Sequence, residues 1–144
     1  MKLTIIVVNY NGAQFLSDCL DSMISQKSFV DPFKIIVFDN ASTDGSLDVI
    51  KDYKDHIELI EHDTNVGFPQ AHNILLPKLD TPFLWLLNND TLFPHDVDVI
   101  TPIIDYFSTD EEIVAISPKL LNTDGSIQIQ GSGFNTFRFK SKHI

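Results

Sequence analysis

The stretch that decides the fold is Phe83-Leu84-Trp85-Leu86-Leu87-Asn88-Asn89-Asp90-Thr91, an apolar run that ends abruptly in two amides and a carboxylate. A run of this length without alternation is typical of a strand buried on both faces, in a sheet that helices cover. Ligands of open parallel sheets bind just beyond the carboxyl ends of the strands. We therefore predict that residues 83–87 form a central strand and that Asp90 lies at the edge of the sheet, where a polar site is expected.

Strand and helix signals alternate along the chain on both sides of this stretch. Runs rich in Ile and Val indicate buried strands, and apolar residues that recur every three to four positions indicate helices. We expect strands at 4–8, 34–38, 57–61 and 113–117, helices at 15–24, 47–53, 69–77 and 95–107, and a hairpin at 120–129. This alternation predicts an α/β fold with a mainly parallel central sheet, in a single domain that spans residues 1–144.

The composition of the 144 residues excludes several classes of protein. A formal net charge of −10 argues against nucleic acid held by phosphate contacts, which need clustered Lys and Arg. The single cysteine, Cys19, cannot form an internal disulfide, and no cluster has the spacing of zinc ligands. No apolar run approaches the roughly eighteen residues of a membrane span, and the amino terminus does not have the pattern of a signal peptide. We expect a soluble, cytoplasmic protein.

Polar loops follow the predicted strands at residues 9–12, 39–46 and 88–90, with residues 63–68 nearby. The carboxylate of Asp39 can accept the ring N–H of uracil or thymine, and the amides of Asn9 and Asn11 can bind a base or a ribose. Helix amino termini suit phosphate, and Asp90 offers a hard oxygen ligand for Mg²⁺ or Mn²⁺ against a diphosphate. These loops indicate a site of the size of a nucleotide.

Each of these residues also has a structural interpretation. Asp90 and Asp39 can cap a helix or open a turn, and Asn9 and Asn11 can satisfy backbone groups of their loops. Asp44 fits a helix cap better than a ligand. A surface or capping role is expected for His62 and His72, core positions for Cys19 and Trp85, and a solvated face for residues 96–98.

Taken together and in this order, the motifs resemble glycosyltransferase family 2, whose members have the GT-A fold, a three-layer sandwich. The branch that they resemble contains rhamnosyltransferases of surface-polysaccharide assembly. The motifs that carry the resemblance are Ile5-Ile6-Val7-Val8-Asn9-Tyr10-Asn11, Val37-Phe38-Asp39-Asn40-Ala41-Ser42-Thr43-Asp44-Gly45-Ser46, Asn65-Val66-Gly67-Phe68, Leu86-Leu87-Asn88-Asn89-Asp90-Thr91, Ser117-Pro118-Lys119-Leu120-Leu121 and Asp124-Gly125-Ser126.

The resemblance implies a nucleotide sugar as donor, linked to UDP or dTDP, and a glycan or lipid-linked saccharide as acceptor. It implies that Asp90 binds the metal, Mn²⁺ or Mg²⁺, that Asp39 reads the base, and that Gly67 lets the backbone pass close to the donor. It also implies a cytoplasmic enzyme with at most peripheral association with the inner face of the membrane. The residues that it places at the nucleotide are Asn9, Tyr10, Asn11, Asp39, Asn40, Ser42, Gly67 and Asn89.

Two positions depart from the family pattern. Asn88 stands where many relatives carry a first aspartate, so metal binding depends on one carboxylate. Inverting members take their general base from a later Glu-Asp segment, and this chain has no such segment after Asp90. Our hypothesis is that residues 1–144 are the donor-binding part of a longer enzyme, incomplete at the carboxyl end. The chain would then bind a nucleotide and transfer sugar poorly or not at all.

The turn after the first predicted strand excludes two other classes of α/β protein. A phosphoacceptor receiver domain needs an acidic pair after its first strand, where this chain has Asn9-Tyr10-Asn11. A dinucleotide-binding enzyme needs a glycine-rich turn there, and Asn11-Gly12-Ala13 is not one. An inactive GT-A-like binding or interaction module stays open, and nucleotide binding separates it from an enzyme. The sequence leaves open the sugar, the nucleotide, the acceptor, the stereochemical outcome and the oligomeric state.

Overall fold

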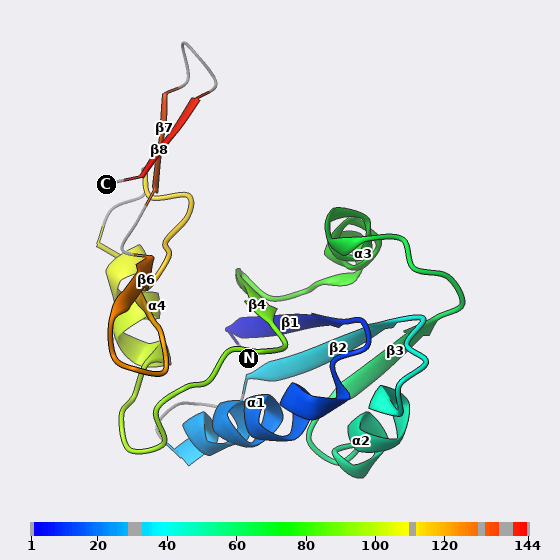
Figure 1. The fold of residues 1–144 in the computed structure, drawn as a ribbon. Coiled ribbons are helices and arrows are strands. Elements are labelled where there is room, and N and C mark those ends of the chain that lie inside the picture. The colour runs from blue at the N-terminus through cyan, green and yellow to red at the C-terminus, as the bar shows by residue number, and fades with distance from the viewer. Residues whose placement is uncertain (1, 29–32, 110–111, 130–131, 136–139, 144) are drawn as a thin grey trace. The chain divides into compact units, whose positions relative to one another are not determined.

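The computed structural model describes residues 2–28, 33–109, 112–129, 132–135 and 140–143. The chain forms two compact units, Met1–Thr101 and Pro102–Ile144. Helix α4 (Ile100–Phe107) begins at the end of the first unit and continues into the second (Figure 1). The other helices and strands of the first unit are β1 (Leu3–Asn9), α1 (Ala13–Ser25), η1 (Gln26–Ser28), β2 (Lys34–Asn40), α2 (Ser46–Asp52), β3 (Glu58–His62), α3 (Phe68–Leu75), η2 (Leu76–Lys78) and β4 (Phe83–Asn88).

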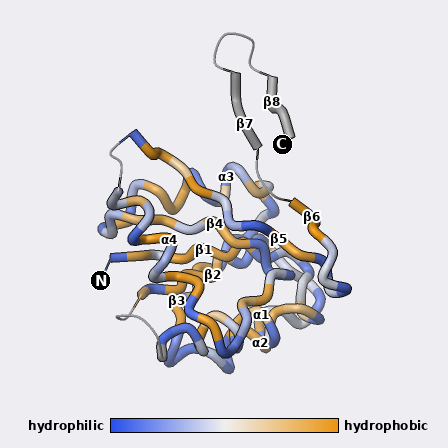
Figure 2. Tube along the Cα trace, turned by 90° about the vertical axis from the view of Figure 1, so that its left-hand side faces the viewer, coloured by the Kyte–Doolittle hydropathy of each residue, from blue (hydrophilic) through white to orange (hydrophobic). Residues whose placement is uncertain are grey.

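The first unit is built on a sheet of four parallel strands in the order β3-β2-β1-β4. Strand β1 lies between β2 and β4, and every one of its residues is buried. Ile and Val fill β1 and β2 because β-branched side chains pack well on a pleated surface. Figure 2 shows both strands as mainly hydrophobic. The sequence-based prediction of a mainly parallel α/β sheet is confirmed.

Helices cover this sheet on both faces, which makes three layers. Helices α1 and α2 lie on one face and α3 on the other (Figure 1). Beneath α3, Ala71 and Leu75 pack with alternate residues of the two central strands, Ile6, Val8, Ile36 and Phe38. Burying side chains of this size contributes roughly 1.5–3 kcal/mol each to the free energy of unfolding. The packing therefore fixes where the polar ends of the strands lie.

Strand β4 is an edge strand of the described sheet, so the prediction that it is central is wrong. Its backbone pairs with β1, from Leu3↔Phe83 to Val8↔Asn88. Only Leu87 of this strand is buried, and Leu86 is 49% exposed. The apolar run correctly indicated a strand, but a run of apolar letters does not encode which strands lie on either side.

Two larger differences concern the predicted helix at 95–107 and the predicted strand at 113–117. The helix predicted at 95–107 begins at Ile100, because the Asp98 carboxylate accepts hydrogen bonds from the backbone N–H groups of Ile100 (3.1 Å) and Thr101 (2.9 Å). Asp98 is thus a helix cap and not simply part of a solvated face. The strand predicted at 113–117 is absent from the described residues, and Val114 is 91% exposed there. Apolar residues form a strand only where a neighbour pairs with them.

The second unit contains the hairpin that the sequence predicts. Strands β5 (Leu120–Leu121) and β6 (Ile127–Ile129) pair antiparallel around a turn in which Gly125 has a φ of +82°. Strands β7 (Ser132–Asn135) and β8 (Lys140–His143) form a second antiparallel pair.

The strand order determines where a ligand is expected. From β1 the chain proceeds outward to β2 and β3, and then crosses to the other side of β1 to form β4. The loops after β1 and β4 therefore diverge at the carboxyl ends of neighbouring strands, which is the switch point where open α/β sheets bind ligands.

Candidate functional site

A pocket of about 320 Å³ lies at this switch point. It contains four of the residues predicted to contact a nucleotide, namely Tyr10, Asn40, Gly67 and Asn89. The residues that line it come from the ends of β1, β2 and β4 and from the start of α3: Val8, Tyr10, Asn40, Asn65, Gly67, Phe68, Asn88 and Asn89. The structure thus brings together loops that are far apart in the sequence.

Asn9 and Asp39 form a buried polar network beside this pocket. They lie opposite each other on β1 and β2 and are 0% and 1% exposed. The Asn9 Nδ2 donates to Asp39 Oδ1 (3.0 Å) and to Ser42 Oγ (3.0 Å). Asp39 Oδ2 accepts from the backbone N–H of Ser42 (2.9 Å). A buried carboxylate is stable only when its oxygens are paired in this way.

The turn after β2 is tied back to the turn after β1. The backbone N–H of Asn11 donates to Ser42 Oγ (3.0 Å), and Asn11 Oδ1 accepts from the backbone N–H of Thr43 (2.8 Å). Asn11 and Ala41 have φ values of +52° and +64°. Asn tolerates this left-handed conformation, whereas Ala adopts it at a cost of roughly 1–2 kcal/mol. Asn11 therefore has a structural partner, as the structural interpretation of this residue expected.

Asn40 connects β2 to the loop that precedes α3. Its Nδ2 donates to Asn65 Oδ1 (2.9 Å), and its Oδ1 accepts from the backbone N–H of Val66 (2.9 Å). Gly67 follows with φ +79° and ψ 163°, a conformation essentially restricted to glycine. An added Cβ on Gly67 would meet nothing within 4 Å, so the backbone conformation, rather than crowding, requires this glycine.

Asn89 links the loop after β4 to the same network. Its Nδ2 donates to Asn9 Oδ1 at 2.7 Å. Gly12 passes directly over this pair, because an added Cβ would lie 2.0 Å from Asn89 Nδ2 and 2.6 Å from Asn9 Oδ1. The absence of a side chain at Gly12 is therefore a condition for the contact between the two loops.

Asp90 differs from the other predicted site residues because its carboxylate is exposed. It lies in the turn after β4, and none of the described residues is recorded as a hydrogen-bond or ion-pair partner of its side chain. The described residues gather no group of three acidic, histidine or cysteine side chains that could enclose a metal. Mg²⁺ and Mn²⁺ are often held by one or two carboxylates together with substrate phosphates and water, and a single free carboxylate fits that mode.

Asp44 acts as a cap, as the sequence predicts, and it serves two helices. Its Oδ2 accepts from the backbone N–H of Ala13 at the start of α1 (3.0 Å), and its Oδ1 accepts from the backbone N–H of Ser46 at the start of α2 (3.0 Å). The Ser46 hydroxyl also donates to Oδ1. These hydrogen bonds favour the charged form and lower the pKa of Asp44 below its ordinary value of 3.8.

Two histidines near the pocket occupy different environments. His62 stacks on Phe38 with ring centroids 5.6 Å apart. His72, for which a surface or capping role was expected, is 5% exposed, so the surface alternative is wrong. Its Nδ1 lies 2.7 Å from the carbonyl oxygen of Phe68, one turn earlier in α3, and its Nε2 is buried without a partner among the described residues.

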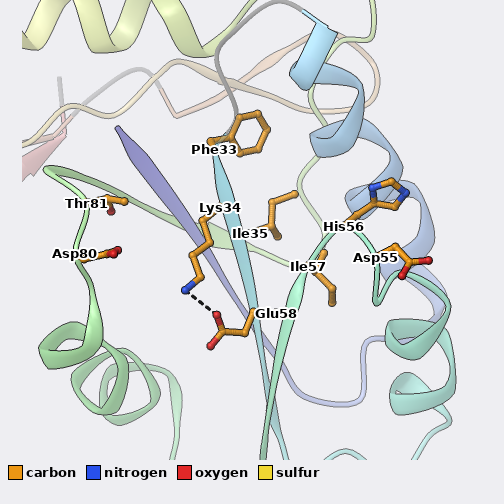
Figure 3. Close-up of a pocket in the computed structure, with 9 residues that line it drawn as sticks. All are labelled: Phe33, Lys34, Ile35, Asp55, His56, Ile57, Glu58, Asp80 and Thr81. Carbon is orange, nitrogen blue, oxygen red and sulfur yellow. Dashed lines mark ion pairs between the residues drawn. The ribbon is translucent and has the colours of Figure 1, made fainter. Parts of the chain in front are cut away.

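A larger hollow of about 560 Å³ lies at the opposite, amino end of the sheet (Figure 3). There Lys34 Nζ and Glu58 carboxylate form an ion pair at 2.6 Å, so the cation in this hollow is already neutralised. Asp55 and Asp80 add negative charge to its rim. Size favours this hollow, but the sheet topology and the gathered amides favour the smaller pocket, and we assign the site there.

The pocket also involves residues that the sequence-based prediction of contacts missed. Val8, Asn65, Phe68 and Asn88 line it although they were not predicted to contact the ligand. Asn65 had a recognisable signal, because it is a polar residue in the loop after a predicted strand. Phe68 had none, since an aromatic residue before a helix is usually core, whereas here it is 45% exposed.

The comparisons of this chain with known proteins agree on one family. Residues 4–142 match the model of glycosyl transferase family 2. The teichoic acid poly(glycerol phosphate) polymerase of Staphylococcus epidermidis is 38% identical over 93 residues, which are 62% of this chain and 13% of that protein. The O-antigen chain rhamnosyltransferase RfbN of Salmonella typhimurium is 29% identical over 146 positions, which cover 100% of this chain and 45% of RfbN. The chain thus spans less than half the length of either relative.

Solved structures share the fold. The crystal structure of S. aureus TarS 1-349 in complex with UDP-GlcNAc matches with a TM-score of 0.65 at 22% identity, over 75% of this chain and 31% of the TarS chain. The mannosyltransferase PcManGT from Pyrobaculum calidifontis, in complex with GDP-Man and Mn²⁺, matches with a TM-score of 0.60 at 27% identity, over 66% of this chain and 29% of PcManGT. The expected GT-A fold is confirmed. Among the described helices none is long and apolar enough to span a bilayer.

Proposed function

Because the chain belongs to glycosyl transferase family 2, we propose that its pocket binds the nucleotide-sugar donor of a glycosyltransferase. The observation that carries this proposal is the position of the pocket, at the switch point of the parallel sheet and lined by side-chain amides. Its volume of about 320 Å³ is within the range of small-molecule sites. The UDP-GlcNAc complex of TarS, which shares the fold, agrees with a ligand of this class.

The buried network would hold the nucleoside. Asp39 uses one lone pair of each oxygen internally, and its remaining lone pairs can accept the ring N–H of a uracil or a thymine. Asn9 and Ser42 keep this carboxylate in one orientation. Tyr10 is 50% exposed at the pocket and can stack on the base. The donor would accordingly carry UDP or dTDP.

Asp90 would hold Mn²⁺ or Mg²⁺ against the diphosphate. Its exposed carboxylate has no recorded partner among the described residues and directly follows Asn89, which lines the pocket. A bound divalent metal would neutralise charge on the departing nucleoside diphosphate. The Mn²⁺ in the PcManGT complex supports a metal of this kind.

We further propose that this chain is the donor-binding part of a longer glycosyltransferase that transfers sugar to a glycan or a lipid-linked saccharide. The teichoic acid poly(glycerol phosphate) polymerase and the O-antigen chain rhamnosyltransferase RfbN are each more than twice as long as this chain. The described residues that line the pocket supply amides but no carboxylate that could deprotonate an acceptor hydroxyl, and the exposed carboxylate of Asp90, which follows Asn89, is assigned here to the metal. On this proposal the chain binds the donor but transfers its sugar poorly or not at all.

Calorimetric titration with UDP and dTDP, in the presence of Mn²⁺, tests the proposal. Tyr10→Ala should weaken binding by about fivefold or more, the loss expected from removing one aromatic ring that stacks on a base. Phe15→Ala is the matched control, because Phe15 is 46% exposed on α1 and does not line the pocket. Equal losses in the two variants would contradict the assignment of the pocket. Failure of the wild-type chain to bind either nucleotide would favour the inactive-module alternative.

A further inference from the structure

Three polar side chains lie buried along the inner face of α1 and the first residue of η1. They are Cys19, Ser22 and Gln26, which are 0%, 1% and 0% exposed. Spacings of three and four residues place them on one side of a helix. We call them the α1 anchor. All three form hydrogen bonds with the chain between the end of β4 and the start of α4, and we call residues 88–99 the β4–α4 segment.

Gln26 makes the largest number of these bonds. Its Nε2 donates to the carbonyl oxygens of Pro94 (2.9 Å) and Val97 (3.1 Å), and its Oε1 accepts from the backbone N–H of Val99 (3.0 Å). Both N–H groups and one oxygen lone pair of this amide are therefore used. The three partners are 68 to 73 residues away in the sequence.

Ser22 and Cys19 extend the anchor toward Asp90. Ser22 Oγ accepts from the backbone N–H of Phe93 (3.1 Å) and donates to the carbonyl oxygen of Cys19 (2.8 Å). Cys19 Sγ lies 3.7 Å from the carbonyl oxygen of Asn88. Burial raises the pKa of the Cys19 thiol to about 12, with a smaller contribution from the negative charge of Asp90. The thiol therefore stays protonated and can donate.

These bonds do more than fill space between α1 and the sheet. Between Asn88 and Ile100 the described backbone forms neither helix nor strand, so its buried N–H and C=O groups need partners from elsewhere. A helix that only covered the sheet would not need polar groups at these positions, since burying them without hydrogen bonds costs free energy. The α1 anchor supplies those partners, and by doing so it determines the path of the segment.

We propose that Gln26 is a positioning residue for Asp90, acting through the β4–α4 segment. By fixing the backbone at Pro94, Val97 and Val99, Gln26 keeps the turn that carries Asp90 at the edge of the pocket. This role rests on the proposed function of Asp90 in metal-dependent nucleotide binding. Gln26 itself is 0% exposed and does not line the pocket, so it would act on the ligand only through the backbone of this segment.

The test compares Gln26→Leu with Thr4→Val. Thr4 is a matched control because it is 0% exposed and accepts a hydrogen bond from Thr81 Oγ1 (2.8 Å), but at the amino end of the sheet. Hydrogen exchange should show the Val99 amide of Gln26→Leu opening about tenfold faster or more, since this buried donor loses its acceptor. In calorimetry with UDP, Gln26→Leu should lose most of the affinity gained on adding Mn²⁺, while its affinity without metal stays within about twofold of wild type. Thr4→Val should change neither quantity.

Ser22→Ala provides a milder variant if Gln26→Leu does not fold. It removes the acceptor of the Phe93 N–H and the donor to the Cys19 carbonyl oxygen but leaves the three bonds of Gln26, so it should reduce the Mn²⁺-dependent gain in affinity less than Gln26→Leu does. An unchanged exchange rate of the Val99 amide in Gln26→Leu, or of the Phe93 amide in Ser22→Ala, would contradict the claim that the α1 anchor fixes the backbone of the segment. A normal Mn²⁺-dependent gain in both variants would overturn the positioning role alone. A wild-type chain that binds no UDP would overturn the proposed function together with the positioning role that rests on it.

Discussion

Two polar loops flank Asn9, and they are stabilised in opposite ways. At the end of β2 and in the loop that follows it, the side chains of Asp39, Ser42 and Asp44 are engaged in hydrogen bonds within the protein. In the β4–α4 segment the backbone is held by hydrogen bonds with Ser22 of α1 and with Gln26, and the carboxylate of Asp90 is exposed. The first loop is thus stabilised by its own polar side chains. The second is stabilised through its backbone, which leaves its carboxylate available.

The residues after β2 therefore have a structural role, whereas Asp90 on the other side of the pocket is available to bind a ligand. The side chains of the loop after β2 have a structural role whether or not a ligand is bound, so their substitution should affect folding and binding together. The side chain of Asp90 has no hydrogen-bond or ion-pair partner among the described residues, so its substitution should change ligand binding and not the stability of the fold.

The largest effect is expected from Asp39→Ala. It removes the acceptor of one Asn9 Nδ2 hydrogen, which is buried, and of the partly buried Ser42 N–H, while the other Asn9 Nδ2 hydrogen keeps its bond to Ser42 Oγ. We expect the free energy of unfolding to fall by about 3 kcal/mol. Urea unfolding followed by the fluorescence of Trp85, the single tryptophan, measures this loss. Asp63→Ala is the control, because Asp63 is exposed and should change stability by less than about 0.5 kcal/mol. Equal stabilities of the two variants would contradict the structural role of Asp39.

The next effect concerns the junction of the two loops. In Gly12→Ala the new methyl group would occupy the position of the Asn9–Asn89 hydrogen bond, 2.0 Å from Asn89 Nδ2. We expect a loss of about 2 kcal/mol, since overpacking of a well-packed site forces neighbouring groups to move.

A double-mutant cycle with Asn89→Ala isolates this contact. With the Asn89 amide absent, Gly12→Ala should cost clearly less than it does in the wild-type chain, by about 1 kcal/mol or more. Additive losses would show that the methyl group is tolerated or clashes elsewhere, and that Gly12 does not serve the contact between the loops.

A smaller effect, dependent on pH, is expected at Asp44. Its pKa is lower in the folded protein than in the unfolded chain, because the folded carboxylate accepts hydrogen bonds from Ser46 and Ala13. Its stabilising contribution is therefore fully present above the ordinary pKa of 3.8 and is lost as the pH falls through the lower folded value. Asp44→Asn should be less stable than wild type near neutral pH, and the difference should shrink below pH 3.8.

Asp124→Asn is the matched control for this titration. Asp124 also accepts from a serine two residues later, Ser126, and its pKa is also lowered, but it lies in the hairpin of the other compact unit. Unfolding followed at Trp85 in β4 should therefore change for Asp44→Asn and not for Asp124→Asn. Equal changes in both variants would indicate a general effect of charge and not the double cap.

Four strands and their parallel direction could be predicted because local signals coincide there. β1 and β2 are short β-branched runs that end in polar turns. The observed β1, Leu3–Asn9, exceeds the expected range of 4–8 by a single residue at each end. The position of β4 at the edge could not be predicted, because its neighbours are set by the path of the whole chain. The missing strand at 113–117 has the same cause, since strand formation needs a partner.

The site was predictable as a set of loops, but not in its individual contacts. Asn9 and Asp39 lie at the carboxyl ends of β1 and β2, and Asn89 directly follows β4, so their proximity followed from the sheet topology. Gln26 carried no signal, because a glutamine after an amphipathic helix resembles a surface residue and its partners lie 68 to 73 residues later. The exposure of Asp90 could not be read from the sequence either, since Asp98 in the same segment is a helix cap.

The assignment of the metal to Asp90 is tested by calorimetric titration of UDP, with and without Mn²⁺, into the wild-type chain, Asp90→Asn and Asp96→Asn. Asp96 is an exposed acid of the same segment and controls for loss of negative charge. We predict that Mn²⁺ strengthens UDP binding to the wild type and to Asp96→Asn but not to Asp90→Asn. All three chains should unfold within about 0.5 kcal/mol of one another. Retention of the Mn²⁺-dependent gain in Asp90→Asn would contradict the assignment of the metal to Asp90.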